Sequence, residues 1–327
     1  MGSDPRVLVV AEADDLIEGL CQGLDDLGWP TVTARTAEAA EATLADWPLD
    51  AVVIDARHPH AGSLPERLRT AALPRRLPVI AVGTSHGHAP TDADMDHAGV
   101  PHAAQAALRI EQLVRAAITE EEFALRAQTF ALHATELKPV DTSGSPLRVL
   151  VAGPADHRFI ALSNALTDDG AEVVAAPTPY TAFDYLHESA FDAAVLWGAP
   201  DHAPALSIAS GMKRNTRLYH IPLTLYLRGA GEIDLAELFH RGFADVATAD
   251  TPEITTAGRV LALAQAHRRQ VAIRKALEAA RGSGLMDPTT GLFTRELFAA
   301  HLGRVAEAAR ARRRPLSVCV LKVAEGD

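Results

Sequence analysis

The sequence predicts two consecutive α/β domains, each built around a parallel β-sheet with helices on both faces. An internal repeat is the first observation: residues 6–10 (RVLVV) recur as 148–152 (RVLVA), and residues 50–55 (DAVVID) recur as 192–197 (DAAVLW), both 142 positions later. The second observation is that the short runs in each copy are uniformly apolar and alternate with segments of helical spacing. Strands buried on both faces have this character, so each copy is expected to be a small doubly wound domain.

The composition narrows the class of protein before any motif is considered. The chain has 327 residues, 48 % of them hydrophobic, which suffices for two to three domains with sizeable cores. Its net charge of −11 argues against a cationic nucleic-acid-binding surface over the whole molecule. Cys21 and Cys319 are far apart in apolar contexts, which favours a reducing compartment over a disulfide scaffold. No signal segment or membrane-spanning run is evident, so we expect a cytoplasmic protein without a membrane or nucleic-acid partner.

Strand and helix signals alternate through the first copy. The apolar run Val7–Val10 is followed by leucines at helical spacing across residues 16–27, and Gly28 then provides a stop signal. The remaining expected elements are strands at Thr31–Thr33, Ala51–Ile54 and Val79–Val82, and helices at Ala37–Leu44 and Ala104–Ile118.

The second copy repeats this series after a joint. Residues 120–137 have a helical pattern, and residues 138–146 concentrate Pro, Gly, Ser and Asp, which favours a flexible linker. The expected elements are strands at Arg148–Val151, Glu172–Ala175, Ala193–Leu196 and Leu223–Leu227, and helices at Phe159–Leu166 and Ile254–Arg274. The predicted divisions are therefore domain one at 1–119, helix and linker at 120–146, domain two at 147–258, a connecting helix at 259–284 and a last segment at 285–327. The connecting helix is either a rigid spacer or a dimer contact, and the spacer is favoured because its heptad pattern is not sustained.

Acidic residues lie at the ends of two predicted strands of the first copy: Glu12 soon after the first and Asp55 directly after the third. The arrangement resembles the receiver domains of response regulators, which are flavodoxin-like domains with a five-stranded parallel sheet. Asp55 matches the phosphoacceptor of that family and Glu12 its second acid, which implies a magnesium site at these two residues. The receiver pattern also has a first acid after strand one, a Ser or Thr at the end of strand four and a Lys at the end of strand five. In this chain those positions align with Ala11, Gly83 and Ala106, which cannot fill these roles. Asp55 is thus either a regulated phosphoacceptor or a relic acid at the mouth of a sheet.

The second copy has lost the chemistry altogether. Gly153 and Pro154 replace the acid pair, Trp197 replaces the phosphoacceptor, and Ala249 falls at the lysine position. The resemblance therefore implies a pseudo-receiver that binds neither magnesium nor phosphate. Two roles remain open for Trp197, Tyr219 and Tyr226, because these aromatic side chains either supply a partner-binding surface or fill the space of the vanished site.

The last segment resembles the opening of a GGDEF domain, the diguanylate cyclase module. Residues 285–295 (LMDPTTGLFTR) match its D-x-L-T-G-L-x-N-R pattern, and residues 315–321 (PLSVCVL) resemble its first core strand. Lys322 and Ala324 then stand where the family carries metal-binding Asp residues, which argues against catalysis. We expect an N-terminal fragment of a degenerate GGDEF domain, whose catalytic core and cyclic di-GMP site would lie beyond residue 327.

Receiver, pseudo-receiver and GGDEF in this order resemble the PleD-related response regulators, and the degenerate sites resemble the PopA-like branch of that family. The resemblance implies a non-enzymatic protein whose tandem domains act as dimerisation and docking modules of a cyclic di-GMP effector. It further implies a position at the cell pole, adaptor and client proteins of a ClpXP-type protease, and a histidine kinase or phosphotransfer protein as phosphoryl donor. The alternative is a phosphorylation-controlled diguanylate cyclase of the PleD type.

Overall fold

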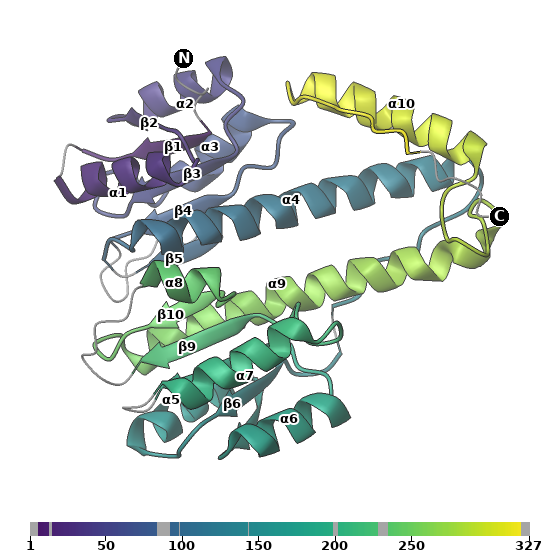
Figure 1. Cartoon of the computed structure of the whole chain (residues 1–327). Coiled ribbons are helices and arrows are strands. Elements are labelled where there is room, and N and C mark those ends of the chain that lie inside the picture. The colour runs from purple at the N-terminus through teal and green to yellow at the C-terminus, as the bar shows by residue number, and fades with distance from the viewer. Residues whose placement is uncertain are drawn as a thin grey trace.

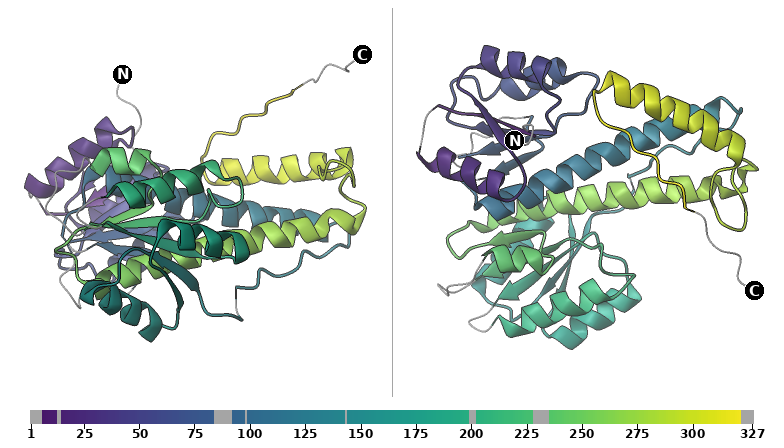
Figure 2. Two further views of the ribbon diagram at one scale, coloured as in Figure 1. Left: turned by 60° about the horizontal axis from the view of Figure 1, so that its bottom comes forward. Right: turned by 45° about the horizontal axis from the view of Figure 1, so that its top comes forward.

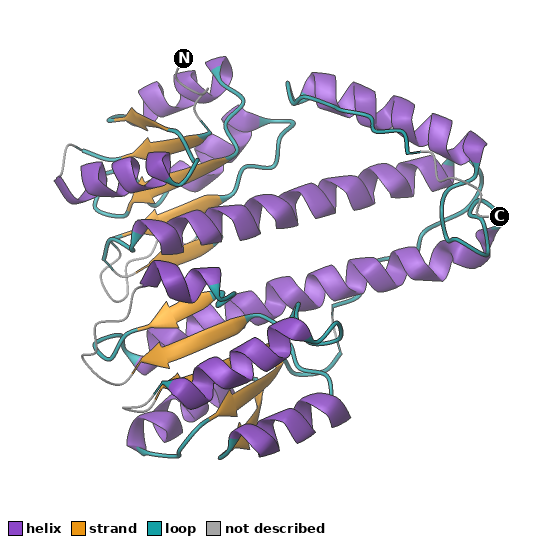
Figure 3. Cartoon of the chain, viewed as in Figure 1, coloured by secondary structure: helices purple, strands orange, loops and turns teal. Residues whose placement is uncertain are grey.

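Two five-stranded parallel sheets form the centres of two α/β domains, which confirms the predicted fold class (Figure 3). The computed structural model describes residues 6–12, 15–83, 92–97, 99–142, 144–198, 202–227 and 235–321. No helix within these ranges has both the length and the apolar character needed to cross a bilayer.

The first domain has the strand order β2-β1-β3-β4-β5, with every pairing parallel. This is the order of flavodoxin-like domains, in which the carboxyl ends of the strands meet at one edge of the sheet. The strands are β1 (Val7–Val10), β2 (Thr31–Ala34), β3 (Ala51–Asp55), β4 (Val79–Val82) and β5 (Met95–His97), and the helices are α1 (Asp15–Asp26), α2 (Ala37–Asp46), α3 (Leu64–Ala72) and α4 (Ala103–Ala131).

The second domain repeats this order, since its sheet reads β7-β6-β8-β9-β10 from the equivalent edge. Its strands are β6 (Arg148–Ala152), β7 (Glu172–Ala176), β8 (Ala193–Gly198), β9 (Leu223–Leu227) and β10 (Asp245–Ala247). Its helices are α5 (His157–Asp168), α6 (Pro179–Glu188), α7 (Ala203–Arg214), α8 (Leu235–His240) and α9 (Glu253–Ala279). The repeated sequence motifs therefore correspond to a repeated fold.

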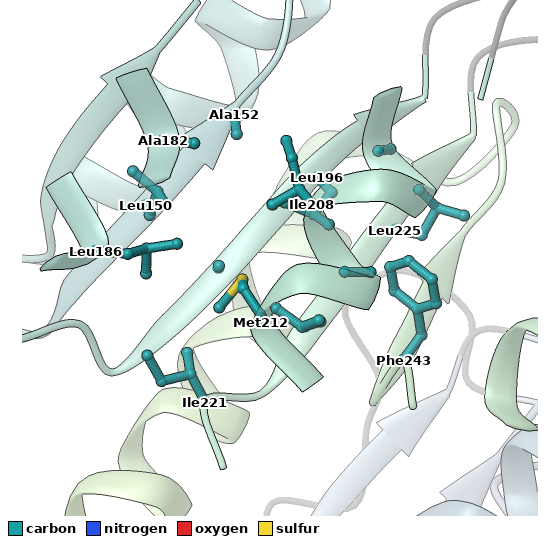
Figure 4. Close-up of a cluster of buried hydrophobic side chains, with 14 of the residues drawn as sticks. Leu150, Ala152, Ala182, Leu186, Leu196, Ile208, Met212, Ile221, Leu225 and Phe243 are labelled. Carbon is teal, nitrogen blue, oxygen red and sulfur yellow. The ribbon is translucent and has the colours of Figure 1, made fainter. Parts of the chain in front are cut away.

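Each sheet is covered on both faces by a separate apolar core, as the uniformly apolar strands predict. Figure 4 shows one face of the second sheet, where Leu196 of β8 and Leu225 of β9 meet Ile208 and Met212 of α7. Burial of these side chains on both faces of each strand fixes the sheet and so fixes where its carboxyl edge lies.

Two long helices run through the expected domain boundaries. α4 runs without a break for 29 residues through the expected boundary at 119/120, and α9 runs for 27 residues through the expected boundary at 258/259. A short 3₁₀ turn at Ala280–Ser283 ends α9, and Gly284 follows at φ 75°, in agreement with the predicted stop. The two helices start side by side at the junction of the domains and extend in the same direction away from it (Figure 1).

The last helix, α10 (Arg295–Ala311), folds back along α4 (Figure 2). A small apolar core joins the far ends of the long helices, with Phe130 of α4 packed near Leu297 of α10. The clasp, which we define as Arg312–Arg314, follows α10 and contacts the first domain. Arg312 and Arg314 pair with the buried Glu121 of α4 at 3.4 and 3.0 Å, and Arg313 donates to backbone carbonyls at the end of α2.

The strand expected at Pro315–Leu321 is absent, and that prediction was wrong. This segment is unpaired chain, and Val320 and Leu321 are 88 % and 86 % exposed. A core strand needs neighbouring strands to satisfy its backbone groups, and the described residues offer none at this position.

Candidate functional site

The carboxyl edge of the first sheet brings together the residues predicted for a receiver site. Asp55 is the last residue of β3, Gly83 directly follows β4, and Ala11 and Glu12 follow β1. Asp55 is only 4 % exposed, whereas Glu12 is exposed. Parallel strands place their ends at one edge of the sheet, so these four positions share that edge.

Arg57 is the partner of Asp55, and the sequence interpretation missed it. Its guanidinium donates from Nε to Oδ1 at 2.9 Å and from Nη2 to Oδ2 at 2.8 Å, and its backbone N–H also donates to Oδ1 at 2.9 Å. Such a bidentate pair between a guanidinium and a carboxylate is a strong, charge-assisted interaction. The sequence did contain an indication of this contact, because an arginine two residues after an acid at a strand end can turn back onto that acid.

The described residues do not form a ready magnesium site. Among them, no group of three or more His, Cys, Asp or Glu side chains is placed to hold a metal ion. Both oxygens of Asp55 are already engaged by Arg57, so a magnesium ion at Asp55 and Glu12 requires the guanidinium to move. The guanidinium of Arg57 therefore neutralises Asp55 in this arrangement.

The structure places Gly83 beside Asp55 but places Ala106 away from the carboxyl edge of the sheet. Gly83 takes a positive φ of 75°, and a Cβ built there would approach Asp55 Oδ1 to 3.3 Å, so the switch position lies against the acid as predicted. Ala106 does not lie at the end of the fifth strand, and that alignment was wrong. β5 ends at His97, and Ala106 is buried in the second turn of α4, within the apolar core of the domain.

The equivalent edge of the second domain is sealed by aromatic rings. Trp197 lies in β8 where Asp55 lies in β3, and it stacks on Tyr226 of the neighbouring strand with 4.3 Å between ring centroids. Phe159 of α5 meets the other side of Trp197 edge-on at 5.6 Å. Trp197 and Tyr226 are 3 % and 0 % exposed, which settles the choice left open by the sequence: these two rings fill the vanished site and offer no surface to a partner.

Gly153 follows β6 at φ 148°, and the space that a side chain would need there is taken. A Cβ at this position would come within 2.3 Å of the Cβ of Trp197. The close approach of the Cβ of Trp197 thus requires glycine at position 153.

Polar contacts tie this aromatic stack to the start of α9. Tyr226 donates its hydroxyl proton to Glu253 at 2.9 Å, and Arg158 pairs with Glu253 and donates to the carbonyls of Ala249 and Thr251. Burial, and then the contact with Glu253, raise the pKa of Tyr226, so its hydroxyl stays protonated. Burial alone would raise the pKa of Glu253, but the hydrogen bonds from Arg158, from the backbone and from Tyr226 together lower it. These contacts hold the aromatic stack against the start of α9.

The segment that resembles a GGDEF opening forms a compact turn. Asp287 accepts hydrogen bonds from the backbone N–H and hydroxyl of Thr290, both at 2.7 Å, and these bonds lower the pKa of Asp287. Gly291 takes a φ of 68°, and Thr294 caps α10 through its hydroxyl. Lys322 and Ala324, the predicted degenerate metal positions, lie outside the described residues.

Comparisons with known proteins give structural likenesses only. No family model matches the chain, and no curated protein matches it. A probable two-component system response regulator/GGDEF domain protein is 14 % identical over 81 % of this chain and 99 % of its own, with a TM-score of 0.34. The chemotaxis response regulator CheY4 of Vibrio cholerae is 13 % identical, covers 36 % of this chain and 99 % of its own, and has a TM-score of 0.33. The Mn²⁺-bound form of response regulator Rcp1 is 12 % identical, covers 34 % and 88 %, and has a TM-score of 0.30. At these scores the fold assignment rests on the strand order of the two sheets.

Proposed function

We propose that this chain is a non-enzymatic signalling protein of the response-regulator type, in which the first domain receives the signal and the second is a fixed scaffold. The observation that carries the proposal is the contrast between the two sheet edges. One keeps a buried acid at the phosphoacceptor position, and the other holds Trp197 and Tyr226 at the equivalent place.

Asp55 is the single phosphoacceptor in this proposal, and Arg57 serves it in two states. In the free protein, the guanidinium neutralises the carboxylate. A phosphoryl group adds a charge of about −1.5 to −2 at neutral pH and offers three acceptor oxygens. Arg57 is 52 % exposed, so it has room to turn from the carboxylate to those oxygens and supply the positive charge that the absent lysine supplies in the family.

The proposal is tested with the whole chain, magnesium and acetyl phosphate. We expect one phosphoryl increment per chain by intact mass spectrometry and none for Asp55→Asn. Two increments would contradict the assignment of the second domain as a scaffold, and no increment would contradict entry of the signal through Asp55. Formation of cyclic di-GMP from GTP and magnesium would contradict the non-enzymatic part.

The cellular role in this proposal is supported by the resemblance to PopA-like regulators alone. It assigns the chain to a cyclic di-GMP effector at the cell pole that presents clients and adaptors to a ClpXP-type protease. A pull-down of the protease machinery from cells, with and without Asp55→Asn, tests this role. Loss of polar position without loss of client turnover would separate the two parts and refute their link.

A further inference from the structure

The two domains meet through equivalent faces. On the first domain the face consists of β5 and the start of α4, and on the second it consists of α8, β10 and the start of α9. α4 contacts α8 and α9, while α9 contacts β5, so each long helix reaches across to the other domain (Figures 1 and 2). The arrangement approximates the self-complementary contact of a twofold dimer, but both partners belong to one chain.

Asp245 of β10 lies at the centre of this contact and is fully buried. Its carboxylate accepts a hydrogen bond from Gln105 Nε2 at 2.7 Å. It also pairs with Arg109 Nη2 and Arg259 Nε, each at 3.2 Å. Gln105 and Arg109 belong to the first domain and Arg259 to the second, so one acid binds groups from both sides.

The two arginines occupy equivalent places in the duplication. Arg109 is the seventh residue of α4 and Arg259 the seventh of α9. The acid has no counterpart in the first domain. Asp245 of β10 pairs with the second residue of β9, and the equivalent residue of β5, which pairs with the second residue of β4, is Met95. Among the described residues, the contact thus contains two matched arginines and one acid that pairs with both.

We propose that Asp245 determines which surfaces pair: it makes the first domain bind the second, whereas Met95 at the equivalent position gives the first domain no acid with which to bind a copy of itself. Self-pairing of the first domain through this face would bring two copies of Arg109 together with Met95 in place of the acid. Buried cations without an acid are strongly unfavourable, whereas the pairing within one chain supplies Asp245. A second copy of this chain must therefore dock on another surface, since this face is already occupied.

Moving the acid across the contact gives a direct test. Met95 lies on the same strand face as His97, whose Nε2 is 3.4 Å from Arg259 Nη1, so an acid at position 95 would point toward the same arginines. We compare Asp245→Asn, the double variant Met95→Asp with Asp245→Asn, and the control Glu237→Gln, which removes an exposed acid from α8 of the same face. Hydrogen exchange of α8 and β10 and the radius of gyration from X-ray scattering are measured on the whole chain.

We expect Asp245→Asn to speed exchange of α8 by about tenfold or more and to enlarge the radius of gyration. The double variant should recover both values, and Glu237→Gln should change neither. Unchanged exchange and size in Asp245→Asn would overturn the proposal. It would also be overturned if the variant exposed Trp197, measured by fluorescence, and Met95→Asp gave no recovery, because Asp245 would then serve only the fold of its own domain.

Discussion

Replacement of Trp197 by alanine tests whether the aromatic stack holds the second domain together. A buried tryptophan removes roughly 150–250 Å² from water, worth at most about 4–6 kcal/mol at ~25 cal/mol/Å². Measured Trp→Ala substitutions in cores cost about 3–5 kcal/mol, which agrees. The ring is 3 % exposed and contacts Tyr226 and Phe159, so a loss of about 4 kcal/mol is expected from a domain whose total stability is about 5–15 kcal/mol.

Urea unfolding measures this loss for each domain. The remaining tryptophans, Trp29 and Trp47, lie in the first domain, so in Trp197→Ala fluorescence reports that domain alone, while far-UV circular dichroism reports both. With a slope of about 2 kcal/mol/M, the midpoint of the second domain should fall by about 2 M. The control is Tyr219→Ala, an aromatic side chain that is 56 % exposed and should change stability by about 0.5 kcal/mol or less. A midpoint shift below about 0.5 M for Trp197→Ala would refute the account of a filled site.

Three further predictions concern single side chains. Arg57→Ala should destabilise the first domain by about 1 kcal/mol in urea, since Asp55 keeps only its backbone donor, and Arg57→Lys should cost less. Burial, and then His220, lower the pKa of His267 to about 4. The unfolded chain therefore binds this proton first, so His267 should contribute a fall in stability of about 1.4 kcal/mol per pH unit as the pH drops from ~6.5 to ~4, and parallel titrations of His267→Phe should lack that contribution. Glu121→Gln should release the clasp, because Arg312 and Arg314 lose their acid, and trypsin should then cleave residues 312–314 faster than in the wild type; equal cleavage would contradict the clasp.

The elements with a strong sequence pattern were predicted well, and the physical reason is local. Strands such as Val79–Val82 and Leu223–Leu227 match the structure, because a uniformly apolar run bounded by turns has few alternative structures. Asp55 could be placed for the same reason: it directly follows such a run. Gly153 and Trp197 could be recognised from the sequence as replacements of receiver acids. That Trp197 leaves no room for a side chain at position 153 became clear only from the distance between them.

The missed features depend on contacts between distant residues. The helical patterns of residues 104–118 and 120–137 were recognised, but their union in one helix was not, because the second half of α4 is stabilised by α10 and by the pairing of Glu120 with Arg269 of α9. β5 is only three residues long, so the alignment slipped into α4 and selected Ala106. The buried position of Asp245 likewise depends on the other domain, because its partners come from α4 as well as α9.

The continuous long helices give the molecule a lever arm. At 1.5 Å per residue, α4 and α9 are about 44 and 40 Å long, and each begins at the contact between the domains. A relative rotation of about 5° at that contact would displace a far end by roughly 3.5 Å, on the scale of a side-chain contact. This displacement would occur at the small core around Phe130 and Leu297, where α10 begins. If the proposed phosphorylation of Asp55 caused such a rotation, the long helices would convert it into a larger displacement of whatever is attached to α10.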